Sequence, residues 1–343
     1  MKKFLIIILS ILIIAQALSL FSCSKKQEKF TYSSFEYFDT VTTIVGYSDS
    51  RKDFDSVCSE ISSLLGEYHK LYDIYNAYEG INNLYSLNRS DSPIQVDKKI
   101  IDLILYSKDI YNKTNGKLNI AMGSVLSIWH DCRESALRDP SSAEVPDISL
   151  LEHASYHTNI EDIIVDAENS TVYRADRELL VDVGAIAKGY AVEMAAKMLE
   201  DKNIKGYLIN VGGNVRAVGA KADGEPWSVG VENPDSSSDD AYASYLDITD
   251  EALVTSGSYQ RYYEFDGIRY HHIIDPETLM PSAYYLSVSV LCDDSALADA
   301  LSTSLFSMPL DDGKLIIEST EGVEAMWILP SGEKTYSSGF NSK

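Results

Sequence analysis

Cysteine and basic residues are both scarce in this chain. Its 343 residues include 4 cysteines, none in a CxxC pair, and 29 Lys and Arg against 52 Asp and Glu, for a formal net charge of −23. Without a disulfide framework, the fold must rest on an ordinary hydrophobic core. So acidic a chain repels phosphate backbones, which argues against nucleic acid as a partner. A phosphorylated small ligand would need a local positive centre, either a metal ion or a few backbone amides and lysines.

Long hydrophobic runs are confined to the N-terminus. Lys2 and Lys3 precede apolar residues 4–21, which end at Ser22-Cys23 and a polar stretch. This pattern resembles a bacterial lipoprotein signal, in which the cysteine is acylated and becomes the mature N-terminus. An uncleaved signal-anchor helix is the alternative, since a run of this length could span a bilayer. We predict a signal peptide over residues 1–22, a lipidated Cys23 with a tether to residue 29, and a domain over residues 30–343. The lipid bilayer would hold that domain at the extracytoplasmic face of the cell membrane.

Proline-rich linkers and internal repeats are also absent, so one compact unit is expected rather than two independent domains. Hydrophobic periodicity predicts interspersed helices and strands. The predicted helices cover residues 54–74, 100–111, 187–201, 295–306 and 313–317, with a short one that ends at Trp129. The predicted strands cover residues 30–47, 163–165, 171–174, 179–183, 207–211 and 323–329, and residues 131–146 are expected to form a polar loop. With hairpins among these strands, the predicted class is α+β.

A turn of small residues joins one predicted strand to a helix. The segment Asp182-Val183-Gly184-Ala185-Ile186-Ala187-Lys188-Gly189 would let backbone groups approach a ligand closely, and the first amides of the helix favour anions. Lys188 adds a positive charge that the helix dipole disfavours unless an anion lies nearby. The GxxxxGK[ST] order of a P-loop is absent. A tight connection that serves only packing would use the same residues.

Two later segments carry groups suited to acid–base or metal chemistry. Alternation along a strand directs His271 and His272 to opposite faces, so the two cannot serve one site together. One imidazole near a carboxylate suits a general base, although a purely structural histidine fits the pattern equally. Asp299 and Thr303 are four residues apart on a predicted helix, so their oxygens share a face that suits Mg²⁺. Helix-dipole and backbone interactions would also account for that pair.

Taken in order, these segments resemble the ApbE family. The resemblance rests on residues 182–189, 298–303 and the segments Leu208-Ile209-Asn210-Val211-Gly212-Gly213-Asn214, Trp227-Ser228-Val229-Gly230-Val231, Thr255-Ser256-Gly257 and His272-Ile273-Ile274-Asp275-Pro276. It extends over residues 38–328. Members of this family are FAD:protein FMN transferases. The resemblance also implies their fold, with mixed and antiparallel sheets flanked by helices and two subregions around a flavin cleft.

The resemblance also implies roles for individual residues. Mg²⁺ would be bound by the carbonyl of Ala185 and by Asp299 and Thr303, and His272 would act as the base. FAD is the implied substrate, with contacts at Phe38, Tyr75, Lys117, Leu118, Asn119, Asp182, Lys188 and Ile273. The chain departs from the family at four positions, with Phe38 in place of Met, Asn119 in place of Asp, and Asp39 and Leu279 in place of Gly.

The implied reaction transfers FMN from FAD to a Thr or Ser hydroxyl of an acceptor protein and releases AMP. Family acceptors carry a D-x-x-[ST]-G-A-T-like motif, and a subunit of a membrane redox complex is one such partner. Two alternatives remain open at the level of sequence. Water could replace the acceptor, which would make the protein an Mg²⁺-dependent FAD pyrophosphatase that yields FMN and AMP. The chain could also be a lipid-anchored flavin-binding protein without catalysis.

Overall fold

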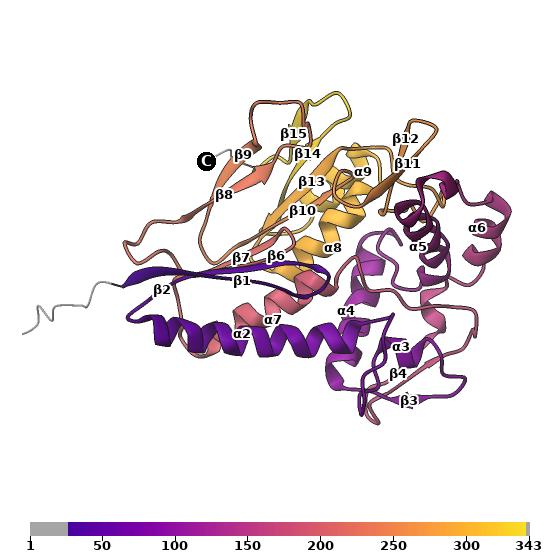
Figure 1. The fold of residues 1–343 in the computed structure, drawn as a ribbon, viewed down its shortest axis with the longest axis horizontal. Coiled ribbons are helices and arrows are strands. Elements are labelled where there is room, and N and C mark those ends of the chain that lie inside the picture. The colour runs from indigo at the N-terminus through magenta and orange to yellow at the C-terminus, as the bar shows by residue number, and fades with distance from the viewer. Residues whose placement is uncertain (1–26, 341–343) are drawn as a thin grey trace, which may run out of the picture.

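An eight-stranded antiparallel sheet forms the centre of the computed structural model, which describes residues 27–340 (Figure 1). The strand order is β1-β2-β6-β7-β10-β13-β14-β15, and each neighbouring pair is antiparallel. These strands are β1 (Glu28–Tyr37), β2 (Thr40–Ser48), β6 (Tyr207–Val211), β7 (Asn214–Val218), β10 (Ala252–Gly257), β13 (Ser287–Cys292), β14 (Glu324–Ile328) and β15 (Lys334–Tyr336).

Smaller sheets and helices surround this centre. The smaller sheets pair β3 (Ile94–Gln95) and β4 (Ile163–Asp166) with β5 (Thr171–Arg174), β8 (Trp227–Glu232) with β9 (Tyr242–Ile248), and β11 (Tyr262–Phe265) with β12 (Ile268–His271). The helices are α2 (Arg51–Tyr72), α3 (Leu84–Leu87), α4 (Lys98–Lys113), α5 (Gly123–Arg138), α6 (Ile148–Ser155), α7 (Ala187–Asp201), α8 (Ser295–Phe306) and α9 (Leu310–Glu318), with short 3₁₀ turns at Pro140–Ser142 and Ile160–Asp162.

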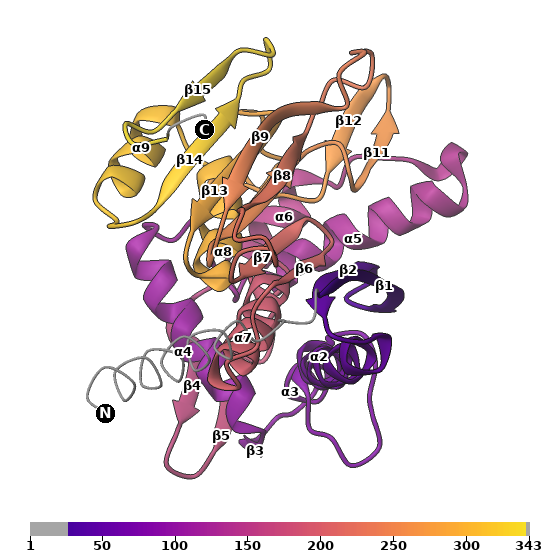
Figure 2. The same ribbon diagram turned by 90° about the vertical axis from the view of Figure 1, so that its left-hand side faces the viewer.

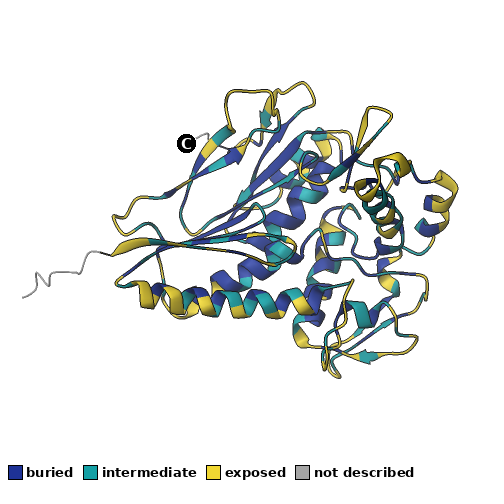
Figure 3. Ribbon diagram, viewed as in Figure 1, coloured by how far each residue is buried: buried dark blue, intermediate teal, exposed yellow. Residues whose placement is uncertain are grey.

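The two faces of the large sheet are covered differently. Helices α2, α7 and α8 lie on one face, and the β8–β9 hairpin lies on the other (Figures 1 and 2). Leu305 of α8 packs with Val288 and Val290 of β13 on the helical side. On the opposite side, Trp227 of β8 packs with Leu253 of β10. The result is a layered structure whose buried residues lie along the sheet and the inner faces of the helices (Figure 3).

Helix α8 is the most deeply buried of these helices and it positions a candidate site residue. The side chain of Asp294 caps it by accepting hydrogen bonds from the N–H groups of Ala296 and Leu297. Gly189 allows α7 to approach it closely, because a Cβ at residue 189 would collide with the carbonyl oxygen of Ser295 and with Cβ of Asp299. The first turn of α7 is therefore held directly against Asp299.

A second subregion lies beside the large sheet. It contains α3 to α6, the β3-β5-β4 sheet and the β11–β12 hairpin (Figure 1). Trp129 of α5 links its parts, since its ring stacks on Tyr270 of β12 and its Nε1–H donates to the carbonyl of Leu279. Within residues 27–340, no helix combines the length and the apolar character that a bilayer crossing requires. The predicted signal peptide and lipidated Cys23 lie outside the described residues.

The predicted α+β class is confirmed, and most predicted elements are present, with three corrections. The predicted strand over residues 179–183 is wrong: only Leu180 forms an isolated bridge, to Met122, and the backbone of Val181 bonds to the side chain of Asn88 instead of to a strand. The loop predicted over residues 131–146 is partly helical, because α5 continues to Arg138. The single strand predicted over residues 30–47 is instead a hairpin, because the chain turns at Phe38 and Asp39 between β1 and β2.

Candidate active site

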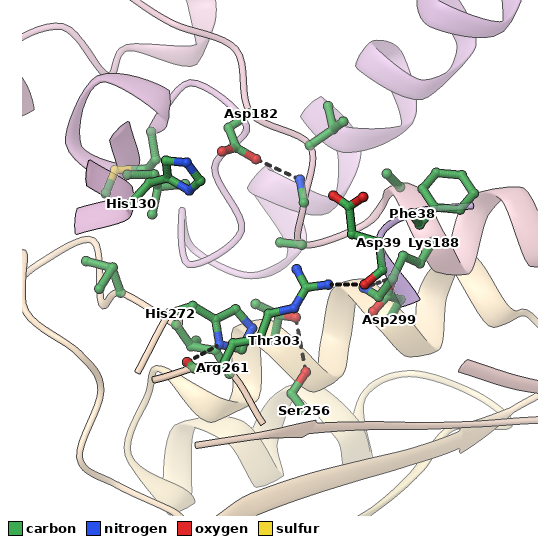
Figure 4. A pocket seen from close by; sticks show the side chains of 18 of the residues that line it. Phe38, Asp39, His130, Asp182, Lys188, Ser256, Arg261, His272, Asp299 and Thr303 are labelled. Carbon is green, nitrogen blue, oxygen red and sulfur yellow. Dashed lines mark hydrogen bonds and ion pairs between the residues drawn. The ribbon is translucent and has the colours of Figure 1, made fainter. Parts of the chain in front are cut away.

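One large cavity lies where the two subregions meet. Its volume is about 410 Å³, and segments far apart in the chain line it. They are the β1–β2 turn at residues 38–40, residues 73–76 and 117–119, α5, the 182–188 turn, the end of β10, residues 260–261 and 270–274, and α8. The side chains of Figure 4 face one another across this space. A site of this kind can surround a ligand with groups from both subregions.

Asp299 lies in the wall of the cavity and is fixed by two hydrogen bonds. Its Oδ2 accepts from the backbone N–H of Gly189 at 2.8 Å and from Nδ2 of Asn214 at 3.0 Å, and Nζ of Lys188 lies 3.6 Å away. In an uninterrupted helix the N–H of Gly189 would donate to the carbonyl of Ala185, four residues earlier. Since it donates to Asp299 instead, the Ala185 carbonyl lacks its usual helical donor.

Hydroxyl groups extend this polar wall along the same helix. Thr303 follows Asp299 by one turn, and its Oγ1 lies 3.2 Å from Oγ of Ser256 on β10. Ser256 also bonds to Ser302 at 2.8 Å. Figure 4 shows Thr303 and Ser256 joined below Asp299 and Lys188. A carboxylate, a hydroxyl and a carbonyl that lacks its helical donor thus line the same cavity, and hard oxygen donors of this type suit Mg²⁺.

The two adjacent histidines have different environments. His271 is buried and its Nε2–H donates to the carbonyl of Ser282 at 2.7 Å. His272 follows the end of β12 and is open to the cavity, with Nδ1 3.2 Å from the carbonyl of Arg261. Because a carbonyl can only accept, the Nδ1 proton is fixed there and Nε2 keeps its lone pair. Nε2 is therefore the atom through which His272 can accept a proton.

The surroundings of His272 keep its imidazole neutral. Desolvation by the protein around it lowers its pKa to about 3, and the positive charges of Arg261, Lys188 and Arg133 add to this effect. We expect the NMR signals of this ring to show no titration between pH 8 and pH 5, with the His272→Asn variant identifying the signals. A midpoint near the ordinary value of about 6.5 would contradict this environment. Since the unfolded chain binds this proton more readily, the contribution to stability is present above pH 6.5 and is lost as pH falls toward 3.

The opposite side of the cavity combines a carboxyl group with aromatic rings. Burial raises the pKa of Asp182, whose Oδ1 accepts from the N–H of Gly184 at 2.8 Å. The ring of Tyr75 stacks on His130 of α5, with centroids 4.9 Å apart. Although Tyr75 is 53% exposed, desolvation by the cavity wall, followed by the charge of Asp182, raises its pKa to about 12. This side offers flat surfaces and hydrogen-bonding groups to an aromatic ring system.

Comparison with known proteins identifies the family. The sequence model of the ApbE family matches residues 38–327. The chain belongs to the ApbE family. It is 27% identical to a Haemophilus influenzae protein named FAD:protein FMN transferase, over 93% of this chain and 91% of that protein. A Vibrio cholerae protein of the same name is 28% identical, with 98% and 97% covered.

Solved ApbE structures have the same fold. The Thermotoga maritima ApbE protein superposes with a TM-score of 0.78 at 27% identity, covering 91% of this chain and 97% of that chain. The flavin transferase ApbE from Vibrio cholerae superposes with a TM-score of 0.75 at 26% identity, covering 92% and 98%. The predicted ApbE-like architecture is therefore confirmed.

The predicted site residues come together along this one cavity, while their individual roles stay predictions. The cavity is lined by Phe38, Tyr75, Lys117, Leu118, Asn119, Asp182, Ala185, Lys188, His272, Ile273, Asp299 and Thr303. They come from both subregions, and their order along the chain gives no indication of how close they lie. The lipidation site, Cys23, is outside the described residues.

Three of these residues are tied to the protein in ways that limit what they offer a ligand. Nζ of Lys117 pairs with Asp275 at 2.9 Å and with Glu277 at 3.0 Å, so its charge is already matched. Leu118 is only 1% exposed and belongs to the hydrophobic core. Asn119 bonds through its side-chain amide to the carbonyl of Thr158 and through Oδ1 to the N–H of Ala121. These residues shape the cavity wall as much as they face into it.

Two arginines that line the cavity were not predicted from the sequence. Arg133 lies on α5, in the segment interpreted as a loop, and Arg261 follows β10 and donates to the carbonyl of Asp39 at 3.3 Å. With Lys188, they bring three basic side chains to the cavity of a strongly acidic protein, and of the two arginines Arg133 also pairs with Glu134 at 3.2 Å. Such a group satisfies the requirement of a phosphorylated ligand, because nearby cations offset its negative charge. The helical spacing of Arg133 from Trp129 was the one available signal.

Proposed function

We propose that this protein is an FAD:protein FMN transferase that moves FMN from FAD to a Ser or Thr hydroxyl of an acceptor protein and releases AMP. The names of the ApbE relatives support the class of reaction. The observation that carries the proposal for this chain is the arrangement of Asp299, Thr303 and the Ala185 carbonyl beside Lys188, with the neutral His272 at the same cavity. This arrangement provides oxygen ligands, positive charge and a proton acceptor in one place.

We include Mg²⁺ in the proposal because the donor set fits it. Asp299 supplies a carboxylate whose Oδ2 is held by Gly189 and Asn214, and no hydrogen bond to its Oδ1 occurs within the described residues. Thr303 and the Ala185 carbonyl supply further oxygens. Mg²⁺ usually retains waters and binds one or two carboxylates together with substrate phosphates, so a site with few protein ligands is sufficient. The ion would neutralise the charge of the FAD diphosphate.

The reaction can be written in terms of this chain's own groups. The acceptor hydroxyl oxygen attacks the phosphorus on the FMN side of the diphosphate, a P–O bond joins FMN to the acceptor, and the P–O bond to AMP breaks. Nε2 of His272 takes the hydroxyl proton. Lys188 and Arg261 offset the negative charge around the diphosphate, while Tyr75 offers a ring to the flavin. The geometry holds the reactants, which is most of what phosphoryl transfer requires.

The acceptor and the cellular location belong to the same proposal. The acceptor would carry a D-x-x-[ST]-G-A-T-like motif and could be a subunit of a membrane redox complex. Residues 255–258 of this chain, Thr-Ser-Gly-Ser, lack the final Ala-Thr of that motif and lie on and just after β10, so modification of the chain itself is not expected. An acylated Cys23 would keep the enzyme on the extracytoplasmic face of the membrane, within reach of such acceptors.

Intact-mass spectrometry tests the proposed function. The full chain in detergent is incubated with FAD, Mg²⁺ and an acceptor fragment that carries the motif, and a fragment with Ala at the acceptor Ser or Thr is the control. We expect the fragment with the intact motif to gain the mass of FMN less one water, and the alanine control fragment to keep its original mass. Free FMN with an unmodified acceptor would indicate hydrolysis, and bound but unchanged FAD would indicate a flavin-binding protein. Either result would contradict the transferase proposal.

A further inference from the structure

A cluster of metal-ligating side chains lies outside the cavity, at the end of α6. His153 and His157 are one helical turn apart, and Glu178 faces them from the segment after β5. Both Nε2 atoms converge on the same oxygen, Oε2 of Glu178, at 4.0 Å for His153 and 3.5 Å for His157. One ligand atom from each of the three residues lies within 4.8 Å of the others. None of the three lines the flavin cavity.

A fourth residue determines how His157 presents its ring. Oδ2 of Asp176 lies 2.7 Å from Nδ1 of His157 and accepts a hydrogen bond from Nδ1–H, so in the neutral ring Nε2 keeps its lone pair. Oδ1 of Asp176 accepts from the backbone N–H of Glu178 at 2.8 Å. A carboxylate behind the imidazole is the usual partner of a metal-binding histidine, because it fixes the tautomer and the ring orientation.

The resulting arrangement calls for a cation. With a neutral ring, the lone pair on Nε2 of His157 points toward the carboxylate of Glu178, and these two acceptors at 3.5 Å need a shared proton or a metal ion between them. Ligands of a tetrahedral Zn²⁺ lie roughly 3.3 Å apart at metal–ligand distances of about 2.0 Å. The side chains of His153 and Glu178 are 69% and 67% exposed, so they can rotate the small distance required and an ion can enter. We propose that His153, His157 and Glu178 bind one Zn²⁺ or a similar divalent transition-metal ion, with water at the fourth position.

This ion would join α6 to a segment that leads into the flavin cavity. Oγ of Ser124 donates to the carbonyl of Glu178 at 2.6 Å, and this hydroxyl oxygen in turn accepts from the N–H of Leu180. Asp182 lies two residues farther along, in the cavity wall. On the other side, Thr158 follows His157 directly and its carbonyl binds the side chain of Asn119. The metal would therefore act as a structural cross-link behind one wall of the cavity.

Zinc titration of the full chain in detergent tests the site. Excess Mg²⁺ is present throughout to occupy oxygen-donor sites, and Zn²⁺ uptake is followed by competition with a chromogenic chelator. We expect His153→Ala and Glu178→Gln each to lose one bound Zn²⁺ relative to wild type. Asp176→Asn should weaken that site by about 10–100-fold, because it removes the partner that orients His157. Zn²⁺ should raise the Tm of wild type and leave the Tm of His153→Ala unchanged.

Glu152→Gln is the matched control, because it removes the same charge from an exposed position of α6 next to His153. It should bind Zn²⁺ like wild type. The proposal is overturned if wild type takes up no Zn²⁺, which would make the cluster an ion pair only. It is also overturned if His153→Ala and Glu178→Gln bind Zn²⁺ as wild type does. Both readouts are independent of FMN transfer, so they do not depend on the proposed enzymatic function.

Discussion

Replacing Asp299 with alanine is expected to lower the rate of FMN transfer by about 10²–10³-fold, the loss typical of removing one group that stabilises a transition state electrostatically. Asp299 is the one carboxylate of the proposed Mg²⁺ site, and it also orients the first turn of α7 through the N–H of Gly189. The rate is measured as FMN-modified acceptor per unit time by intact-mass spectrometry. The Mg²⁺ concentration at half-maximal rate should rise as well, because the remaining ligands are neutral.

The alanine variant also removes the acceptor for two buried donors, so a loss of folding must be separated from a loss of chemistry. Asp299→Asn keeps the shape and one oxygen for Gly189 while it removes the charge, and we expect it to stay folded by circular dichroism and still to lose transfer. Asp293→Asn is the matched control, because it removes an equal charge from an exposed residue just before α8. It should transfer FMN at the wild-type rate. Normal transfer by Asp299→Asn would show that the carboxylate charge is not required.

The sequence was sufficient for those parts of the fold that depend on local periodicity. Helix α2 was predictable because its buried residues recur every three or four positions, from Phe54 to Tyr72. Strand β6 and the turn after it were predictable from an apolar run followed by two glycines, both of which have positive φ. The strand predicted over residues 179–183 failed because a continuous apolar run indicates burial and not pairing. That segment is largely buried, yet its backbone bonds to the side chains of Asn88 and Ser124 and to the backbone of Ile120 and Gly123, and not to a neighbouring strand.

The site was predictable where motifs mark it and unpredictable where only the tertiary fold creates it. Asp299 and Thr303 reveal their shared face by spacing, but their proximity to Ala185 depends on the contact of α7 with α8 at Gly189. Arg261 reaches the cavity because a loop carries it there, and no periodicity records that. Nor does the sequence reveal that Leu279 adopts a left-handed conformation that glycine usually takes, with φ of 60°. A non-glycine residue there costs about 1–2 kcal/mol, and Leu279 offsets part of this by packing in the core.

Replacing His272 with asparagine is expected to slow FMN transfer by about 10²–10⁴-fold, the range that general-base catalysis contributes. Asparagine can still donate its side-chain N–H toward the carbonyl of Arg261, so the local contact of Nδ1 is retained while the accepting Nε2 is lost. The dissociation constant for FAD should change little, because Lys188 and Arg261 remain in place. Transfer is measured by intact mass, and FAD binding by flavin fluorescence, on the same preparations.

The pH dependence separates a base from a residue that only positions the substrate. In wild type the pKa of His272 is lowered to about 3, so the imidazole is already neutral between pH 8 and pH 5. The value of kcat/KM for transfer, which reports groups of the free enzyme, should therefore not fall over this range. Without the imidazole, hydroxide must remove the acceptor proton, so the rate of the asparagine variant should rise with pH, approaching tenfold per unit. In the complex with FAD, the negative charge of the diphosphate raises the pKa of the nearby imidazole, so any fall in the wild-type rate would begin at a higher pH than in the free enzyme. If the variant and wild type have parallel profiles, His272 is a positioning residue, and the proton leaves by another route.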